Sequence, residues 1–259
     1  MGEHHWKTAI TEIKPNEVRL RGYRIDELMG RTGFAEAIWL ALTGELPSRE
    51  VGRLIEAIFV SSIDHGATPP SALAAHTVAS TGAPINASVA AGVLSINKWH
   101  GGAIEDAMRM FYAGVERMDA EGLTFDGAAG AILDSLKAKG ERAMGYGHRV
   151  HTKDPRTARL FELAKDAKLE GKFLNLALAI AEAIEKRSGK PLPLNVDGAI
   201  AAVLCELGIP PELANAFFII SRVPGLVAHA HEEVTRQKPM RVVDPKDHEY
   251  DGPSARELP

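Results

Sequence analysis

The chain has 259 residues, of which 45% are hydrophobic, 25% charged and 6% aromatic, and its formal net charge is −4. These values are typical of globular proteins and exclude disordered, collagen-like and fibrous classes. A nucleic-acid-binding protein usually carries a basic surface, so we expect no nucleic-acid partner. The single cysteine, Cys205, cannot form a disulfide within the chain, and Met1–Lys7 shows no signal-peptide pattern, which together favour a cytoplasmic protein.

The longest stretch without Asp, Glu, Lys or Arg is His65–Asn97, which is rich in Ala, Ser, Thr and Gly and is interrupted by prolines. A membrane span needs about 20 consecutive, strongly apolar residues. We therefore expect no membrane partner. Small residues over this length indicate closely packed helices instead.

The sequence pattern predicts a short β-hairpin followed by many helices. In Lys7–Tyr23, two segments of alternating polarity flank Pro15-Asn16, which predicts the hairpin. From Ile25 onward, apolar residues recur at helical spacing, and we expect an all-α fold apart from the hairpin. The predicted helices are one ending at Gly44–Pro47, one from Ser48 to His65, then Ala72–Ser80, Ala87–Ile96, Gly101–Glu116, Thr124–Lys139, Thr157–Ala167, Phe173–Arg187, Asn195–Leu207, Pro211–Arg222 and Leu226–Arg236.

Four polar clusters interrupt this helical array: Asp64-His65-Gly66, Trp99–Gly102, Gly145–Arg149 and Asn195–Gly198. Each places an ionisable residue beside glycine, at or near a predicted helix terminus. Glycine lets the backbone approach a ligand closely, and helix termini shift side-chain pKa values. A single cluster is better explained by helix capping or a loop than by a functional site. The combination of histidines with an aspartate favours general acid–base chemistry.

No metal site is predicted. The sequence contains no CxxC motif, and the His-x-His pair at positions 229 and 231 is too sparse for a zinc site. We expect these two histidines to pack on a helix or lie at the surface. The polar clusters therefore indicate proton transfer rather than metal coordination.

The stretch Gly145–Val150, which reads GYGHRV and is followed by Asp154-Pro155-Arg156, closely resembles the hallmark of citrate synthases. Four further motifs resemble those of that family in the same order along the chain. They are Asp64-His65-Gly66, His100–Ala103, Asn195–Asp197 and Ser221-Arg222. The similarity extends from about residue 25 to residue 241. The resemblance implies a citrate synthase-like, all-α fold.

The resemblance also implies three catalytic residues. His100 would polarise the thioester carbonyl of acetyl-CoA, Asp197 would remove or return the methyl proton, and His148 would hydrogen-bond the keto oxygen of oxaloacetate. The chemistry fits these residue types, because breaking a carbon–carbon bond next to a thioester produces an enolate. An acid or base in position contributes about 10²–10⁴-fold, and a donor aimed at the oxyanion about 2.7–4 kcal/mol.

The substrate-binding residues that the resemblance implies are His65, Arg156, Arg222 and Arg241. The first three would hold the oxaloacetate carboxylates, which the planar fork of arginine matches in a bidentate fashion. Arg241 would reach into the site of a partner subunit. Gly145, Tyr146 and Gly147 would lie against the CoA adenine, with the CoA thioester as a substrate and no permanently bound cofactor. On residue type alone, structural salt bridges would explain the same arginines.

Citrate synthases carry a long N-terminal helical section that this sequence does not show. The short form of the fold is that of citryl-CoA lyase and of the C-terminal module of ATP-citrate lyase. We therefore expect a citryl-CoA lyase, which cleaves citryl-CoA to acetyl-CoA and oxaloacetate through an acetyl-CoA enolate. Two alternatives stay open: a citrate synthase, since the same residues run the condensation, and a non-catalytic CoA-binding subunit.

The resemblance further implies two domains. Residues 1–101 and 208–259 would form a large helical domain, and residues 102–207 a small CoA-binding domain that closes over the substrates and excludes water. If Arg241 acts in trans, the active unit is a homo-oligomer, at least a dimer.

Overall fold

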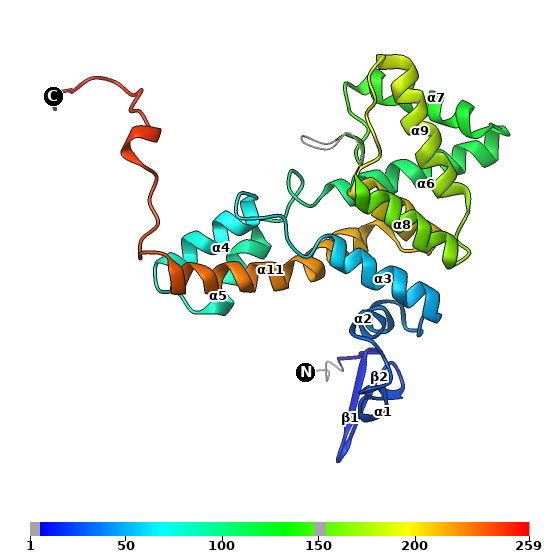
Figure 1. Ribbon diagram of the computed structural model, residues 1–259, viewed down its shortest axis with the longest axis horizontal. Coiled ribbons are helices and arrows are strands. Elements are labelled where there is room, and N and C mark those ends of the chain that lie inside the picture. The colour runs from blue at the N-terminus through cyan, green and yellow to red at the C-terminus, as the bar shows by residue number, and fades with distance from the viewer. Residues whose placement is uncertain (1–5, 148–153, 259) are drawn as a thin grey trace, which may run out of the picture. The chain divides into compact units, whose positions relative to one another are not determined.

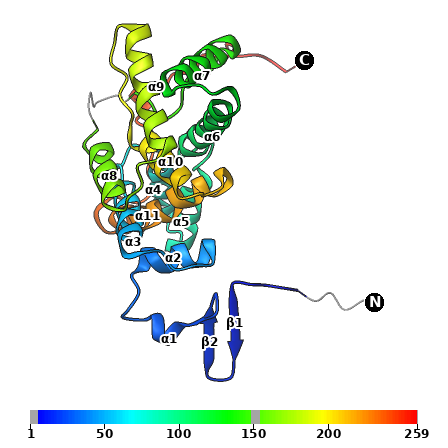
Figure 2. The ribbon, with the colours of Figure 1, turned by 90° about the vertical axis from the view of Figure 1, so that its right-hand side faces the viewer.

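Residues 6–147 and 154–258 are described by the computed structural model, and helices dominate them (Figures 1 and 2). The predicted hairpin is confirmed: β1 (Thr11–Lys14) pairs antiparallel with β2 (Glu17–Leu20). Asn16 makes the turn with a φ of 61°, a conformation that asparagine tolerates better than most residues. A short β3 (Tyr23–Arg24) adds a third strand, and α1 (Ile25–Leu28) follows it.

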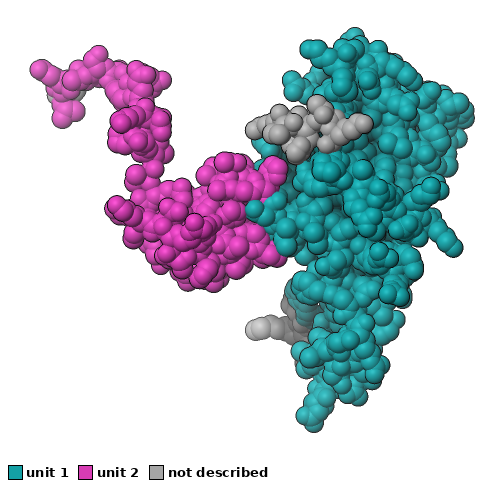
Figure 3. Space-filling model, viewed as in Figure 1, with its two compact units in different colours: residues 1–64, 96–222 teal, residues 65–95, 223–259 magenta. Residues whose placement is uncertain are grey.

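The chain divides into two compact units (Figure 3). Unit 1 contains residues 1–64 and 96–222, and unit 2 contains residues 65–95 and 223–259. The sequence predicts a different division, with residues 1–101 and 208–259 in a large domain and residues 102–207 in a small domain that closes over the substrate. The two compact units are defined by contacts within a single conformation, so they do not test which part moves. The predicted division therefore stays a prediction.

Unit 1 contains eight of the helical segments that follow α1 in the described residues. Three of them begin where the sequence predicts, because the side chains of Ser48, Thr124 and Asn195 accept hydrogen bonds from the first turns. The segments are α2 (Phe34–Thr43), α3 (Arg49–Ser61), α6 (Ala103–Glu121), α7 (Phe125–Lys139), α8 (Pro155–Asp166), α9 (Lys172–Ser188), α10 (Val196–Glu206) and the 3-10 turn η1 (Pro211–Leu213).

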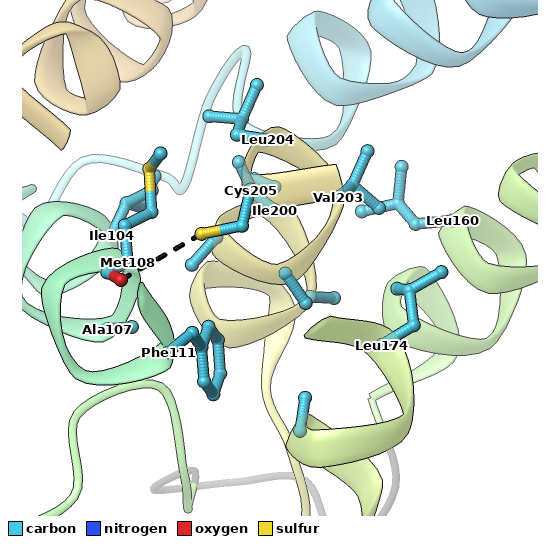
Figure 4. Close-up of a cluster of buried hydrophobic side chains, with 14 of the residues drawn as sticks. Ile104, Ala107, Met108, Phe111, Leu160, Leu174, Ile200, Val203, Leu204 and Cys205 are labelled. Carbon is cyan, nitrogen blue, oxygen red and sulfur yellow. Dashed lines mark hydrogen bonds between the residues drawn. The ribbon is translucent and has the colours of Figure 1, made fainter. Parts of the chain in front are cut away.

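Helix α10 forms the centre of unit 1. Its residues from Ala199 to Cys205 are all buried, and α6, α8 and α9 pack around it. Figure 4 shows side chains of these helices gathered around Ile200, Val203 and Cys205. The Cys205 thiol lies 3.9 Å from the carbonyl oxygen of Met108, and burial raises its pKa. Cys205 is therefore a buried structural thiol.

Unit 2 consists of α4 (Pro70–Ser80), α5 (Ile85–Leu94), the second half of α11 (Ala214–Arg236) and the tail with its 3-10 turn η2 (Pro245–Asp247). Small residues let these helices approach closely, as predicted. A Cβ on Gly92 would lie 2.8 Å from the Leu226 side chain and 2.9 Å from the carbonyl oxygen of Ser71.

The prediction of separate helices over Pro211–Arg222 and Leu226–Arg236 is wrong. The chain makes the turn η1 and then one helix, α11, which continues through Pro224. Proline removes one backbone donor and disfavours the preceding turn, but buried residues on both sides, among them Phe217 and Leu226, hold the two halves in place. The boundary between the two units falls here, between Arg222 and Val223.

The segment Pro211–Arg236 is long and apolar enough to cross a membrane by length and composition alone, with a mean hydropathy of 1.3. The core helix of a globular protein passes the same test. The buried Arg222 and Glu233 of this segment are paired with other protein groups, as in a core helix.

Candidate active site

The glycine loop Gly145–Gly147 is fixed to the segment that precedes α10. The Gly147 N–H donates to the carbonyl of Pro193 (2.8 Å), and the Asn195 N–H donates to the carbonyl of Gly145 (3.0 Å). The Asn195 side chain donates to the carbonyl of Gly147 (2.9 Å). Three hydrogen bonds thus hold the loop that leads directly to His148.

Tyr146 is turned into the protein. Its hydroxyl donates to the carbonyl of Ala177 in α9 (2.9 Å), and burial raises its pKa well above the ordinary value. Its side chain therefore anchors the loop, and the contact of Gly145, Tyr146 and Gly147 with the CoA adenine stays a prediction.

Asp197 is the second residue of α10, directly after the cap that Asn195 provides. The Asn195 side chain accepts from the Gly198 N–H (3.1 Å), which fixes the first turn and with it the backbone that carries Asp197. Gly198 permits a close approach of the glycine loop, since a Cβ on Gly145 would lie 2.6 Å from its Cα. The carboxylate is half-buried.

His100 lies in a tight turn just before α6. The backbones of Asn97 and His100 donate to each other's carbonyls, at 2.8 and 2.9 Å. Gly101 follows with a φ of 87°, and a Cβ there would lie 2.6 Å from Ile96 and 2.9 Å from the Phe218 ring. No other residue type fits at Gly101, so the turn sets the His100 ring edge-on to Phe218, with centroids 5.9 Å apart.

Arg222 reaches the same phenylalanine from α11. Its guanidinium carbon lies 4.8 Å from the Phe218 ring centroid, and its Nε donates to the carbonyl of Ser62 (3.0 Å). Burial lowers the pKa of Arg222, while the carboxylates of Asp64 and Asp197 raise it. A buried cation therefore lies close enough to Asp197 to feel its charge, and it contacts the Phe218 ring, which the His100 ring also contacts.

Arg156 is held by Asp154, a residue that the sequence analysis did not assign to the site. The buried Asp154 caps α8 and accepts from Nε (3.0 Å) and the terminal nitrogen (2.8 Å) of Arg156. It also accepts from the N–H of Val196 (3.3 Å), the first residue of α10. Asp154 thereby joins an arginine of the predicted site to the helix start that carries Asp197. Only its neighbourhood in the Asp-Pro-Arg motif could have indicated it.

Unit 1 thus contains most of the predicted site. His100 and Arg222 both contact Phe218, and the charges of Asp197 and Arg156 act on Arg222. His148 lies outside the described residues. The other two predicted residues, His65 and Arg241, belong to unit 2.

In unit 2, Arg241 pairs with a buried carboxylate. Its Nε donates to Glu233 (3.1 Å), and Nδ1 of the buried His76 lies 2.9 Å from the other carboxylate oxygen. The bond from Arg241 lowers the pKa of Glu233. The Arg241 backbone is tied to Ser80 (3.1 Å). His65 is exposed. The role predicted for each of them stays a prediction.

A cavity of about 770 Å³ adjoins the His100 turn and the segment that precedes the glycine loop, and all its lining residues belong to unit 1. Its walls are the turn residues Lys98 and Trp99, helices α6 and α7, and the segment from Lys139 to Met144. Ligand sites for small molecules and cofactors fall in this size range. Five cations against two carboxylates line it: Lys98, Arg109, Arg117, Lys139 and Arg142 against Asp106 and Glu141.

This arrangement can perform acid–base chemistry next to a bound anion. Asp197 is a carboxylate at a helix start, His100 is a donor held in a rigid turn, and Arg222 supplies a buried positive charge. Among residues 6–147 and 154–258, no group of three or more His, Cys, Asp or Glu could hold a metal ion.

Residues 48–243 match the family described as citrate synthase, C-terminal domain. The citrate synthase of Heyndrickxia coagulans is 33% identical over 196 residues, which cover 74% of this chain and 50% of that protein. The chain spans about half the length of the curated citrate synthases that it matches.

Two solved structures share the fold over nearly the whole chain. That of citryl-CoA lyase from Hydrogenobacter thermophilus is 45% identical with a TM-score of 0.88, covering 98% of this chain and 97% of that chain. ATP citrate lyase from Methanothrix soehngenii, in complex with citrate and coenzyme A, is 24% identical with a TM-score of 0.83, covering 98% of this chain and 43% of that chain. Because its identity is below 25%, the second match shows a similar fold and nothing more.

Proposed function

We propose, since the chain belongs to the citrate synthase family, that it is a citryl-CoA lyase, which cleaves citryl-CoA to acetyl-CoA and oxaloacetate. The observation that carries this proposal is the 45% identity to the lyase of Hydrogenobacter thermophilus, which extends over 98% of this chain and 97% of that one. The grouping of His100, Asp197, Arg156 and Arg222 in unit 1 supports it.

The cleavage step assigns a task to each acid–base group. His148 accepts the proton of the citryl hydroxyl as the adjacent carbon–carbon bond breaks, which leaves the keto group of oxaloacetate. The electron pair of that bond passes to the acetyl-CoA enolate, whose oxygen accepts a hydrogen bond from His100. Asp197 in its acid form then gives its proton to the enolate carbon and completes acetyl-CoA. A donor fixed in a rigid turn stabilises the oxyanion without reorganisation.

The arginines bind the carboxylates of the substrate. Arg222 is oriented by Ser62 and Phe218, and Arg156 by Asp154 and the carbonyl of Ser61. Because both guanidinium groups are held before substrate arrives, little side-chain entropy is lost when a carboxylate binds.

The cationic cavity beside the His100 turn is the proposed site for coenzyme A. Its volume, its excess of positive charge and its position beside the turn fit a ligand with phosphates at one end and a thioester at the other. The CoA thioester enters as a substrate, and no permanently bound cofactor is needed for the steps above.

We also propose a cytoplasmic homo-oligomer, at least a dimer. Arg241 would then bind a substrate carboxylate in the active site of a partner subunit. Its side chain is 40% exposed, so it can contact such a carboxylate while it stays paired with Glu233. Sedimentation of the purified protein tests this part: a fully active monomer would contradict it.

The proposed function is tested by supplying purified protein with citryl-CoA and, separately, with acetyl-CoA plus oxaloacetate, while free CoA and oxaloacetate are followed. Oxaloacetate from citryl-CoA without free CoA supports the lyase. Rapid release of free CoA from acetyl-CoA plus oxaloacetate would identify a citrate synthase instead. CoA binding without turnover in either assay would identify a non-catalytic CoA-binding subunit.

A further inference from the structure

Helix α11 carries a carboxylate, Glu233, that is buried in unit 2 and that the proposed catalytic steps do not use. Its side chain is only 1% exposed. Removing a carboxylate from water is costly, and an apolar side chain of similar volume is often at least as stabilising at such a position. Stability alone is therefore a weak reason for a carboxylate here, and the partners of Glu233 give a stronger one.

Glu233 binds one edge of the Arg241 guanidinium. One carboxylate oxygen accepts from Nε (3.1 Å), and the other accepts from the terminal nitrogen Nη2. Arginine has five N–H donors in a rigid fork, and this pairing engages the Nε edge. Nη1 makes no hydrogen bond within residues 6–147 and 154–258, and the side chain is 40% exposed. The Nη1–Nη2 edge can therefore bind a second carboxylate in a bidentate fashion.

The backbone next to this arginine is fixed to the end of α4. The Ser80 carbonyl accepts from the Met240 N–H (2.8 Å), and the Ser80 hydroxyl accepts from the Arg241 N–H (3.1 Å). Met240 has a φ of 59°, a left-handed conformation that is unfavourable for a residue with a Cβ and persists only where its surroundings enforce it. The backbone and the guanidinium of Arg241 are thus both held before a ligand binds.

His76 of α4 covers the same carboxylate. Its Nδ1 lies 2.9 Å from Glu233, and its side chain is 5% exposed. Its ring lies edge-on to that of His229, with centroids 5.0 Å apart. Burial lowers the pKa of His76 and so favours the neutral ring, which excludes water from Glu233 and leaves Arg241 as its charged partner.

We infer that Glu233 is a positioning residue for Arg241. It holds the Nε edge of the guanidinium, so that the Nη1–Nη2 edge binds a carboxylate of the citryl group. This inference rests on the proposed function, in which Arg241 serves the active site of a partner subunit. Without Glu233, Arg241 keeps its charge but loses its fixed direction.

The test measures kcat and KM for citryl-CoA separately. Glu233→Gln should raise KM about 2- to 12-fold, the fold-change that corresponds to ordering one long side chain when substrate binds. The kcat value should change little, because a substrate carboxylate is bound in the ground state and the transition state alike. Ser80→Ala removes the hydroxyl that accepts the Arg241 N–H and should raise KM roughly 2- to 5-fold.

Two comparisons separate positioning from a purely structural role. In an Arg241→Ala background, Glu233→Gln should cause no further rise in KM, because Glu233 acts through the arginine. The matched control is Glu232→Gln, the next residue along the helix, which pairs with the exposed Arg236. This control should keep the wild-type KM.

An unchanged KM in Glu233→Gln and Ser80→Ala would overturn the inference, and Ser80→Ala decides alone if Glu233→Gln does not fold. A lower KM in Glu233→Gln would also overturn it, because Glu233 would then compete with the substrate for Arg241. A wild-type KM in Arg241→Ala would overturn the inference while the lyase activity stands. If wild-type protein does not cleave citryl-CoA, the proposed function fails and the inference fails with it.

Discussion

Gly145 and Gly198 approach each other so closely that neither has room for a side chain: a Cβ on Gly145 would lie 2.6 Å from the Cα of Gly198. This contact joins the loop that leads to His148 to the first turn of the helix that carries Asp197. The proposed groups that act on the hydroxyl and on the enolate carbon are therefore connected through backbone alone, without any flexible side chain between them.

Gly198→Ala should destabilise the protein, because the new methyl group would overlap the carbonyl of Gly145 and the backbone would have to shift. Overpacking of this kind costs about 1–3 kcal/mol. The free energy of unfolding, measured with urea, checks this. The control is Gly130→Ala in α7, where the nearest atom to a new Cβ is 3.5 Å away and helix propensity predicts a gain of up to about 1 kcal/mol. Equal stability of Gly198→Ala and wild type would contradict the close contact.

Asp154→Asn should weaken both the site and the fold. The variant loses the charge that holds Arg156 and weakens the hydrogen bond from the Val196 N–H at the start of α10. We expect a loss of about 2–3 kcal/mol in the free energy of unfolding, together with a higher KM for citryl-CoA. The control is Asp134→Asn, which breaks the exposed pair with Arg187 and should cost less than about 1 kcal/mol. Similar losses in the two variants would show that Asp154 has no special role.

The same residue predicts a pH dependence. Burial raises the pKa of Asp154, but the bonds from Arg156 and the N–H of Val196 outweigh it, so the pKa lies below the ordinary value of 3.8. The stabilisation is therefore present in full above about pH 4 and is lost as the pH falls through the lower folded-state pKa. In urea unfolding between pH 6 and pH 2.5, stability should fall less steeply for Asp154→Asn than for wild type. Parallel curves would contradict the assignment.

Arg222→Lys should weaken oxaloacetate binding while keeping the charge. Lysine cannot form the planar fork and lacks the guanidinium that lies over Phe218. The inhibition constant of oxaloacetate as a product inhibitor should rise about 10-fold, the equivalent of one charged hydrogen bond of about 1.5 kcal/mol. Arg236→Lys, in the exposed last turn of the same helix, should leave it unchanged. An unaltered constant in Arg222→Lys would remove this arginine from carboxylate binding.

The sequence predicted the features that depend on local interactions. The helix starts at Ser48, Thr124 and Asn195 were predictable because a cap is a bond within one turn of the chain. The single helix through Pro224 was not, because packing of distant residues on both halves overrides the local preference of proline.

The site was predictable only in part for the same reason. The motifs identified His100, Asp197, Arg156 and Arg222, and all four belong to unit 1. The bond between Asp154 and Val196 spans 42 residues, and no spacing rule indicates it.

The central claim is that this constellation breaks a carbon–carbon bond with Asp197 as the acid that protonates the enolate. The most direct measurement is the rate of oxaloacetate release from citryl-CoA by Asp197→Asn against Asp126→Asn. Both aspartates are the second residue of their helix after a side-chain cap, but Asp126 is exposed in α7. We predict a loss on the order of 10²–10⁴-fold for Asp197→Asn, with coenzyme A still bound, and a nearly wild-type rate for Asp126→Asn. Equal rates in the two variants would contradict the mechanism.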